Sequence, residues 1–271
     1  MDHCDRSVSS DGGDRGRELP IGELVTDSPA RYPERRPLVG RYVTVTPLAP
    51  AVHGESLWSH LGGPQHAHLW TYLHWGPFPS RDAFMADLEA KAISEDWIFF
   101  AIVDRPSGGA VGYAAYMRAK PGHGSIEIGG LCYGPRLQRT RGATEAMYLM
   151  ARHAFEELGY RRYEWKCHAL NAASRRAALR LGFVYEGTFR QHQIIKGRSR
   201  DSDWYSMLRR EWPDRKRALE RWLDPANFDA DGRQRQPLAS PAPGAVRAAC
   251  AVHADGAAAG PRPTTPEGAT E

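Results

Sequence analysis

The residues of this chain that could do chemistry lie in two stretches, 125–146 and 171–187. In the first, a strand-like run leads through a loop carrying Arg136, Arg139 and Arg141 into a long helical pattern. The first turn of a helix offers unpaired N–H groups and the positive end of its dipole, which together bind anions. Guanidinium groups beside that end suit a diphosphate. A plain helix start on a basic surface has the same pattern, so this stretch alone leaves both interpretations open.

The second stretch begins with Asn171 at the end of a strand-like run, and Ser174 follows within one helical turn. An asparagine here is a good helix N-cap, and a first-turn serine needs no further role. The same pair can also present an amide and a hydroxyl to a ligand. In the strand of the first stretch, Gly129 and Gly130 indicate a bulge or the close approach of another backbone or a ligand.

The elements that must position these residues follow from periodicity and turn residues. Period-two alternation predicts seven strands, over residues 39–47, 97–104, 110–119, 125–133, 160–169, 184–195 and 202–209. Helical spacing, caps and glycine stops predict helices over residues 53–61, 81–93, 142–158, 172–181 and 213–222. The aromatic, proline-containing stretch 70–79 is expected to be an ordered loop.

Composition indicates one folded domain with extensions at both ends. The chain has 271 residues, of which 41% are hydrophobic and 25% charged, as in globular proteins. The ends are poor in aromatic residues and rich in charge, or in alanine, proline and glycine, so we expect them to be disordered. The expected organisation is a disordered extension at 1–37, a domain at 38–212, a short helix at 213–228 and a disordered tail at 229–271.

Several classes of protein are not indicated. The longest purely apolar run has seven residues, 97–103, against about 20 for a membrane span. The N-terminal residues lack a signal-peptide pattern. The four cysteines are scattered without a CxxC pair, which favours a reducing cytoplasm over a disulfide framework or a zinc ribbon. A net charge of +4 suggests an anionic ligand without indicating nucleic acid.

Together the motifs resemble the GNAT superfamily of acyl-CoA-dependent N-acyltransferases, and most of all the ribosomal-protein-alanine N-acetyltransferases. The resemblance covers residues 37–210. It is carried by QRTRGA at 138–143, TEA at 144–146, NAAS at 171–174 and LGFVYEG at 181–187, downstream of an antiparallel meander. It implies an α+β fold: a mostly antiparallel central sheet of about seven strands, with a splayed parallel pair and helices on both faces.

The resemblance also implies acetyl-CoA as co-substrate and assigns residues to it. Backbone N–H groups of the loop would hold the diphosphate of coenzyme A, and these are Gln138, Arg139, Thr140, Arg141, Gly142 and Ala143. The strand end Leu131, Cys132 and Tyr133 would pair with the pantetheine amides. Asn171 would contact the pantetheine arm, and Ser174 would lie near the thioester sulfur as the acid for the leaving thiolate.

The residue that deprotonates the amine is less well marked. A lysine-like amine is neutral only about once in a thousand at pH 7, so it needs a base more than an N-terminal amine does. Glu127, Glu164, His168 and His192 are candidates, with Glu164 placed first. The chain departs from the family pattern at three positions: Arg141 replaces a usual glycine, Ala178 a tyrosine and Gln193 a glutamate.

The expected activity is therefore acetyl transfer from acetyl-CoA to a primary amine, by direct attack, in a cytoplasmic monomer or homodimer. The alternative is a non-catalytic acyl-CoA-binding or protein-interaction module on the same fold. Nucleic-acid binding by a basic face is a weaker option, and its residues would be Arg175, Arg176, Arg180, Arg198 and Arg200. A covalent route through Cys132 and a metal site at His66, His68 and His74 are both weaker than packing roles.

Overall fold

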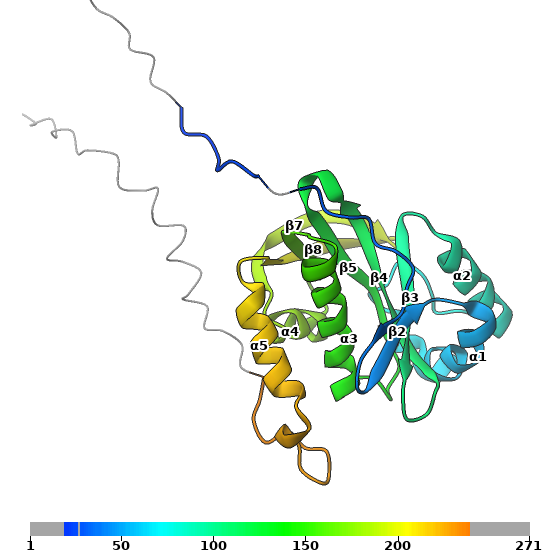
Figure 1. Ribbon diagram of the computed structural model, residues 1–271. Helices are drawn as coiled ribbons and strands as arrows, with labels where there is room; N and C mark the ends of the chain where they lie inside the picture. The colour runs from blue at the N-terminus through cyan, green and yellow to red at the C-terminus, as the bar shows by residue number, and fades with distance from the viewer. Residues whose placement is uncertain (1–18, 27, 239–271) are drawn as a thin grey trace, which may run out of the picture.

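The computed structural model describes residues 19–26 and 28–238. Its centre is an eight-stranded sheet in the order β1-β2-β3-β4-β5-β6-β8-β7 (Figure 1). Neighbouring strands are antiparallel except β5 and β6, which run parallel. The predicted mixed fold with one parallel pair is confirmed, with one strand more than the seven expected.

The bounds of the elements agree with most of the sequence predictions. The strands are β1 Leu38–Val39, β2 Val43–Pro47, β3 Trp97–Asp104, β4 Ala110–Lys120, β5 Ser125–Tyr133, β6 Arg162–His168, β7 Val184–Ile195 and β8 Arg198–Leu208. The α-helices are α1 Pro50–Leu61, α2 Arg81–Ile93, α3 Arg141–Arg152, α4 Ala172–Arg180 and α5 Trp212–Leu223. Short 3-10 turns, η1 Pro64–Trp70, η2 Pro121–His123 and η4 Pro225–Asn227, complete the set, with a π-helical turn, η3 His153–Glu157.

The extra strand arises because residues 39–47 do not form one strand. β1 and β2 are a small antiparallel pair, and Glu145 of α3 holds the turn between them. Its buried carboxylate accepts the backbone N–H groups of Arg41, Tyr42 and Val43 at 2.7, 2.6 and 2.9 Å. A contact about a hundred residues away in sequence therefore decides the turn, and local alternation could not show it.

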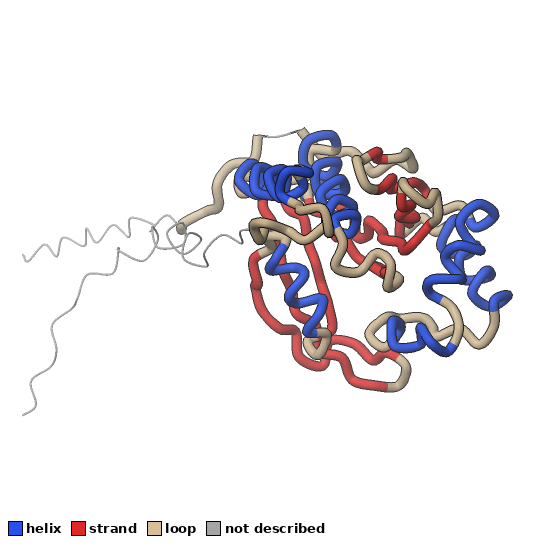
Figure 2. Tube along the Cα trace, turned by 90° about the horizontal axis from the view of Figure 1, so that it is seen from below, coloured by secondary structure: helices blue, strands red, loops and turns tan. Residues whose placement is uncertain are grey.

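Helices cover both faces of the sheet, in two separate groups (Figure 2). On one face α3, α4 and α5 pack over the main core, where Phe155, Tyr163 and Trp212 are buried together. On the other face α1 and α2 cover β3 and β4 through a second core around Trp70 and Phe84. This second group contacts β3 and β4 and does not extend to β6, β7 and β8 within the described residues.

The crossover between the parallel strands is the helix predicted at 142–158. α3 is capped by Thr140, whose Oγ1 accepts the Ala143 N–H at 3.2 Å. The helix continues as the π-helical turn η3 and stops before Gly159, which has a φ of 82° and so uses the glycine freedom expected there.

The two extensions are ordered further than the sequence predicts. Ala30 and Arg31 donate backbone hydrogen bonds to Pro121 and Leu158. At the other end Phe228 pairs with Gln234, and Leu238 is buried in the main core. The disorder expected for 1–37 and 229–271 is therefore wrong for residues 28–37 and 229–238. Residues 1–18, 27 and 239–271 lie outside the described part of the chain. No helix in the described ranges is long and apolar enough to cross a membrane.

Candidate active site

A cleft opens where the parallel strands part. The last paired residues are Ile128 and Trp165, although β5 continues to Tyr133 and β6 to His168. The register between β4 and β5 shifts just past Gly129, and Gly130 takes a φ of 59°. The glycine pair thus marks a bulge, as its position in the strand predicts. The bulge lies where the two parallel strands stop pairing, so it helps β5 to turn away from β6.

Four parts of the chain line this cleft: the splayed strand ends with the start of α4, the β7–β8 hairpin, the aromatic segment after η1, and the neighbouring strands β3 and β4. Among the predicted site residues, Leu131, Asn171 and Ser174 line it together. So do three of the four candidate bases, which are Glu127, His168 and His192. Lys196 at the hairpin turn donates to the Trp70 carbonyl at 2.8 Å, which fastens the hairpin to η1.

Asn171 and Ser174 hold the start of α4. The Asn171 Oδ1 accepts the Ser174 N–H at 3.1 Å, so the N-cap role expected for Asn171 is present. The Trp165 indole donates its Nε1–H to the Ser174 Oγ at 3.0 Å. That bond uses an acceptor lone pair of the serine, and the Cys167 side chain is a second hydrogen-bond partner of the same hydroxyl. Trp165 therefore orients the Ser174 hydroxyl beside the cleft.

The loop before α3 uses half of its predicted N–H donors for its own structure. Those of Gln138, Thr140 and Ala143 bond within the loop, to Gly134, Leu137 and Thr140. Among the described residues, no acceptor meets the N–H groups of Arg139, Arg141 and Gly142. Arg139 has a φ of 61°, an unusual value for a residue with a side chain. These three donors at the helix start form the candidate anion site.

The side chain of Arg141 does not occupy that anion site. Its guanidinium lies over the rings of Tyr42 and Phe228, 4.8 Å from each ring centre. The arginine that replaces the family's usual glycine thus stacks against β2 and the C-terminal segment, and its backbone N–H remains unpaired. Phe228 follows α5, so residues beyond the predicted domain support the loop.

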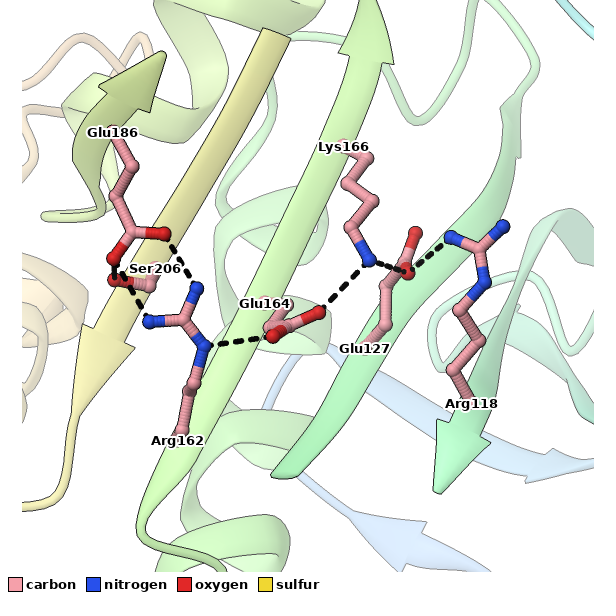
Figure 3. Close-up of polar contacts among 7 residues, drawn as sticks. All are labelled: Arg118, Glu127, Arg162, Glu164, Lys166, Glu186 and Ser206. Carbon is pink, nitrogen blue, oxygen red and sulfur yellow. Dashed lines mark hydrogen bonds and ion pairs between the residues drawn. The ribbon is translucent and has the colours of Figure 1, made fainter. Parts of the chain in front are cut away.

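Glu164, the first-placed base, is held in an ion-pair network instead of lining the cleft. Figure 3 shows the network crossing the sheet from Arg118 on β4 to Glu186 on β7. Both Glu164 oxygens are engaged, by Arg162 at 2.7 Å and Lys166 at 2.9 Å. Burial opposes ionisation of this carboxylate, but the bonds and charges of Arg162 and Lys166 outweigh it and lower its pKa. A carboxylate so paired is a weak base.

Glu127 belongs to the same network. It is almost fully buried, and its Oε2 accepts from Lys166 at 2.8 Å and from Arg118 at 2.9 Å. Its Oε2 is therefore occupied by two cations inside the network.

The three histidines of the cleft differ in which ring nitrogen is free. Burial, with nearby cations adding to it, lowers the pKa of His74, His168 and His192, so each ring is neutral at pH 7. A neutral ring has one lone pair. In His168 it accepts the Leu170 N–H at 3.1 Å, and in His74 it faces an arginine N–H at 3.4 Å. His192 can donate from Nδ1 to Ser202 Oγ at 2.9 Å, which leaves its Nε2 lone pair free.

The strand end 131–133 divides between the two sides of β5. Leu131 lines the cleft, whereas Cys132 is buried in the second core. Burial raises the pKa of Cys132 to about 12, so the thiol stays protonated and has no nucleophilic thiolate. The Tyr133 carbonyl accepts from the Gln138 amide at 2.8 Å, which ties the strand end to the loop.

Two weaker sequence hypotheses gain no support. Within the described ranges, no three His, Cys, Asp or Glu side chains gather as metal ligands. The five arginines proposed as a basic face do not share one surface. Arg200 is buried, Arg180 bonds Thr144 and stacks on Trp222, and Arg175 pairs with Asp203.

Sequence reasoning did not assign two residues of the cleft, Arg200 and Ser202, to a site. Arg200 and Ser202 line the cleft from β8, and Tyr72, His74 and Trp75 line it from the loop after η1. A signal existed for the first two, because Arg200 and Ser202 are two residues apart on a strand and must share a face. Which face that was depended on the sheet order.

Comparisons with known proteins agree with this geometry. Residues 47–184 match the family model described as Acetyltransferase (GNAT) domain. A GCN5-related N-acetyltransferase from Brucella melitensis is 44% identical, with a TM-score of 0.78 over 79% of this chain and 97% of that one. A GNAT-family structure from Chromobacterium violaceum is 38% identical, with a TM-score of 0.67 over 73% of this chain and 98% of that one.

A more distant neighbour shares the fold. The microcin C7 self-immunity acetyltransferase MccE, solved with acetyl-CoA and AMP, is 21% identical with a TM-score of 0.54. The match covers 62% of this chain and 93% of the MccE chain. A comparison with curated protein sequences finds no match.

Proposed function

Because the chain belongs to the GNAT family of acetyltransferases, we propose that it moves the acetyl group of acetyl-CoA to a primary amine by direct attack. One observation carries the proposal. β5 and β6 stop pairing at Ile128 and Trp165, and the cleft beside their splayed ends holds titratable groups. The end of β5 leads through a short loop to the start of α3 with its unpaired N–H groups. That arrangement can hold a long thioester at one end and an amine at the other.

The coenzyme would lie along the gap between the splayed strands. Its diphosphate would accept from the N–H groups of Arg139, Arg141 and Gly142 at the positive end of α3. The pantetheine arm would run past Leu131 on one side and Asn171 on the other, whose Nδ2 meets no acceptor in the described chain. The thioester would then reach Ser174, which lines the cleft.

Two side chains would move the protons. His192 takes a proton from the amine through Nε2 as the nitrogen attacks the thioester carbon and the C–N bond forms. When the C–S bond breaks, the leaving thiolate accepts the Ser174 proton, and the proton that His192 took from the amine returns to the serine through water, so both side chains end neutral. Even without full transfer, the Ser174 hydroxyl would stabilise the developing negative charge. The neutral state of His192 at pH 7 supports its role as the base.

The test measures thiol release with acetyl-CoA and a panel of primary amines, with products identified by mass. For Ser174→Ala and His192→Gln, we expect the maximal rate to fall by about 100-fold, the scale of a lost acid or base. Coenzyme affinity should be unchanged by calorimetry. If Ser174 is only a helix residue, Ser174→Ala lowers stability by up to about 1 kcal/mol and leaves the rate per folded molecule unchanged.

A matched control separates positioning from chemistry. Trp165→Phe keeps an aromatic side chain and removes the N–H that orients Ser174, together with part of a buried ring, so rates are compared per folded molecule. It should lower the rate by less than Ser174→Ala, and the double variant should add little to the serine variant alone. Coenzyme binding without acetylation of any amine would instead favour the non-catalytic alternative.

A further inference from the structure

The acceptor side of the cleft contains a buried cation without a counter-ion. Arg200 of β8 is 8% exposed and lines the cleft. Its Nε donates to the Ser202 Oγ at 3.1 Å, and its Nη1 lies 3.4 Å from the His74 Nε2. Both partners are neutral, and no carboxylate in the described part of the chain pairs with this guanidinium. At least half of its five N–H groups meet no acceptor.

Glu127 attracts Arg200 electrostatically, but its carboxylate is already bound to Arg118 and Lys166 and makes no ion pair with Arg200. The network of Figure 3 contains three cations, Arg118, Arg162 and Lys166. It contains three anions, Glu127, Glu164 and Glu186, each already bound to one or more of those cations. Buried charges in proteins are ordinarily paired, because an unpaired one loses its hydration without compensation. Arg200 is therefore a cation in surplus, placed in a ligand cleft.

We propose that the acceptor amine also carries an anionic group, a carboxylate or a phosphate, which Arg200 binds. The inference rests on the proposed function and names its substrate class. A guanidinium offers two parallel N–H groups that match the two oxygens of such an anion. The anion would complete the pairing of Arg200 and fix the orientation of the amine.

The spacing of the site limits how far apart the two groups of the acceptor can be. Ser202 lies between Arg200 and the base His192, with hydrogen bonds of 3.1 and 2.9 Å. An anion on Arg200 and an amine within reach of His192 are consequently separated by only a few bonds. A small amino acid or aminoalkyl phosphate fits this spacing better than a long polyamine, which would also be repelled by the guanidinium.

The experiment compares acceptors that differ only in charge. The matched pair is 4-aminobutyrate and its uncharged amide, 4-aminobutanamide. A third acceptor, 3-aminopropyl phosphate, shows whether the site prefers a phosphate or a carboxylate. For the wild type we expect kcat/KM to favour an anionic acceptor by about 10- to 100-fold, the range for hydrogen bonds to a charged group. In Arg200→Gln the preference should fall to near one, with the KM for acetyl-CoA unchanged.

Arg198→Gln is the matched control, because Arg198 is an exposed arginine on the same strand. It should keep the wild-type preference. If Arg200 instead stabilises the reaction for every amine, Arg200→Gln will slow the anionic acceptor and its amide equally, and the inference is overturned. A wild-type enzyme that prefers the amide overturns it as well.

A binding measurement keeps the inference separate from catalysis. Trp75 and Trp97 line the cleft, so their fluorescence should respond when 4-aminobutyrate binds to the wild type in the presence of coenzyme A. We expect saturable quenching by the carboxylate and little by the amide. Equal responses refute the anion site even if acetylation occurs. Acetylation of no amine, with carboxylate binding intact, would refute the proposed function alone.

Discussion

The anion site at the start of α3 can be tested by removing a single backbone N–H. Arg141 is the first residue of the helix, a position where proline is well accepted because its fixed φ suits the first turn. The preceding Thr140 has φ −99° and ψ 168°, the extended conformation that a residue before proline prefers. Arg141→Pro should therefore keep the helix and delete only one donor and one side chain.

The deleted side chain needs its own control, because Arg141 stacks on two rings. Arg141→Ala loses the same stacking and keeps the N–H. The expected difference between the two variants is thus the hydrogen bond to the diphosphate alone. A bond to a charged group contributes about 1.5–3 kcal/mol, so acetyl-CoA should bind about 10- to 150-fold more weakly to the proline variant than to the alanine variant.

Calorimetry with acetyl-CoA measures both affinities, and far-ultraviolet circular dichroism checks that the helix is intact. Repeating the titration with dephosphorylated pantetheine acetyl thioester, which has no diphosphate, should abolish the difference. Equal affinities of the proline and alanine variants for acetyl-CoA would refute the placement of the diphosphate at this helix start.

Three further outcomes follow from buried groups. Glu145→Gln should lower the free energy of unfolding by about 3 kcal/mol in urea titrations, because its carboxylate accepts three backbone N–H groups. Gly40→Ala should also destabilise the fold, because the added Cβ would lie 2.5 Å from that carboxylate. Burial lowers the pKa of His153 to about 4. Below pH 6.5 the unfolded chain therefore binds a proton that the folded chain does not, so the free energy of unfolding is highest above pH 6.5 and falls as the pH falls toward 4. The fall amounts to about 3 kcal/mol, and His153→Gln should flatten the stability profile between those pH values. Cys132→Ala should keep the wild-type kcat, and a large loss of rate without loss of folding would revive covalent catalysis.

Much of the fold was predictable because its signals are local. Alternation in residues 97–133 marked the meander, the glycines at 159 and 182 marked helix ends, and the long amphipathic helix between two strands required a parallel crossover. The site residues Asn171 and Ser174 were predictable through their motif, and the structure brings both to the cleft with Leu131.

Errors arose where distant parts of the chain decide a local outcome. Residues 39–47 read as one strand because only Glu145, on α3, shows that a turn belongs there. The sequence shows Arg141 only as a departure from the family pattern, because Tyr42 and Phe228, on which its side chain stacks, lie about a hundred residues away on either side. The tail from 229 looked disordered because its buried contacts involve only a few residues.

The sequence by itself determined the fold and the coenzyme motifs, because periodicity and caps depend on neighbours along the chain. Only the tertiary structure decided the state of each polar group. Alternation alone puts Arg162, Glu164 and Lys166 on one face of β6, but only strand order brings Glu127 of β5 and Glu186 of β7 to the same two cations. Arg200 reads as one of several surface arginines, yet the pairing of β8 with β6 places it in the cleft beside the splayed strand ends. Whether a charge is paired or left over depends on which strands lie side by side, and no local pattern encodes that order.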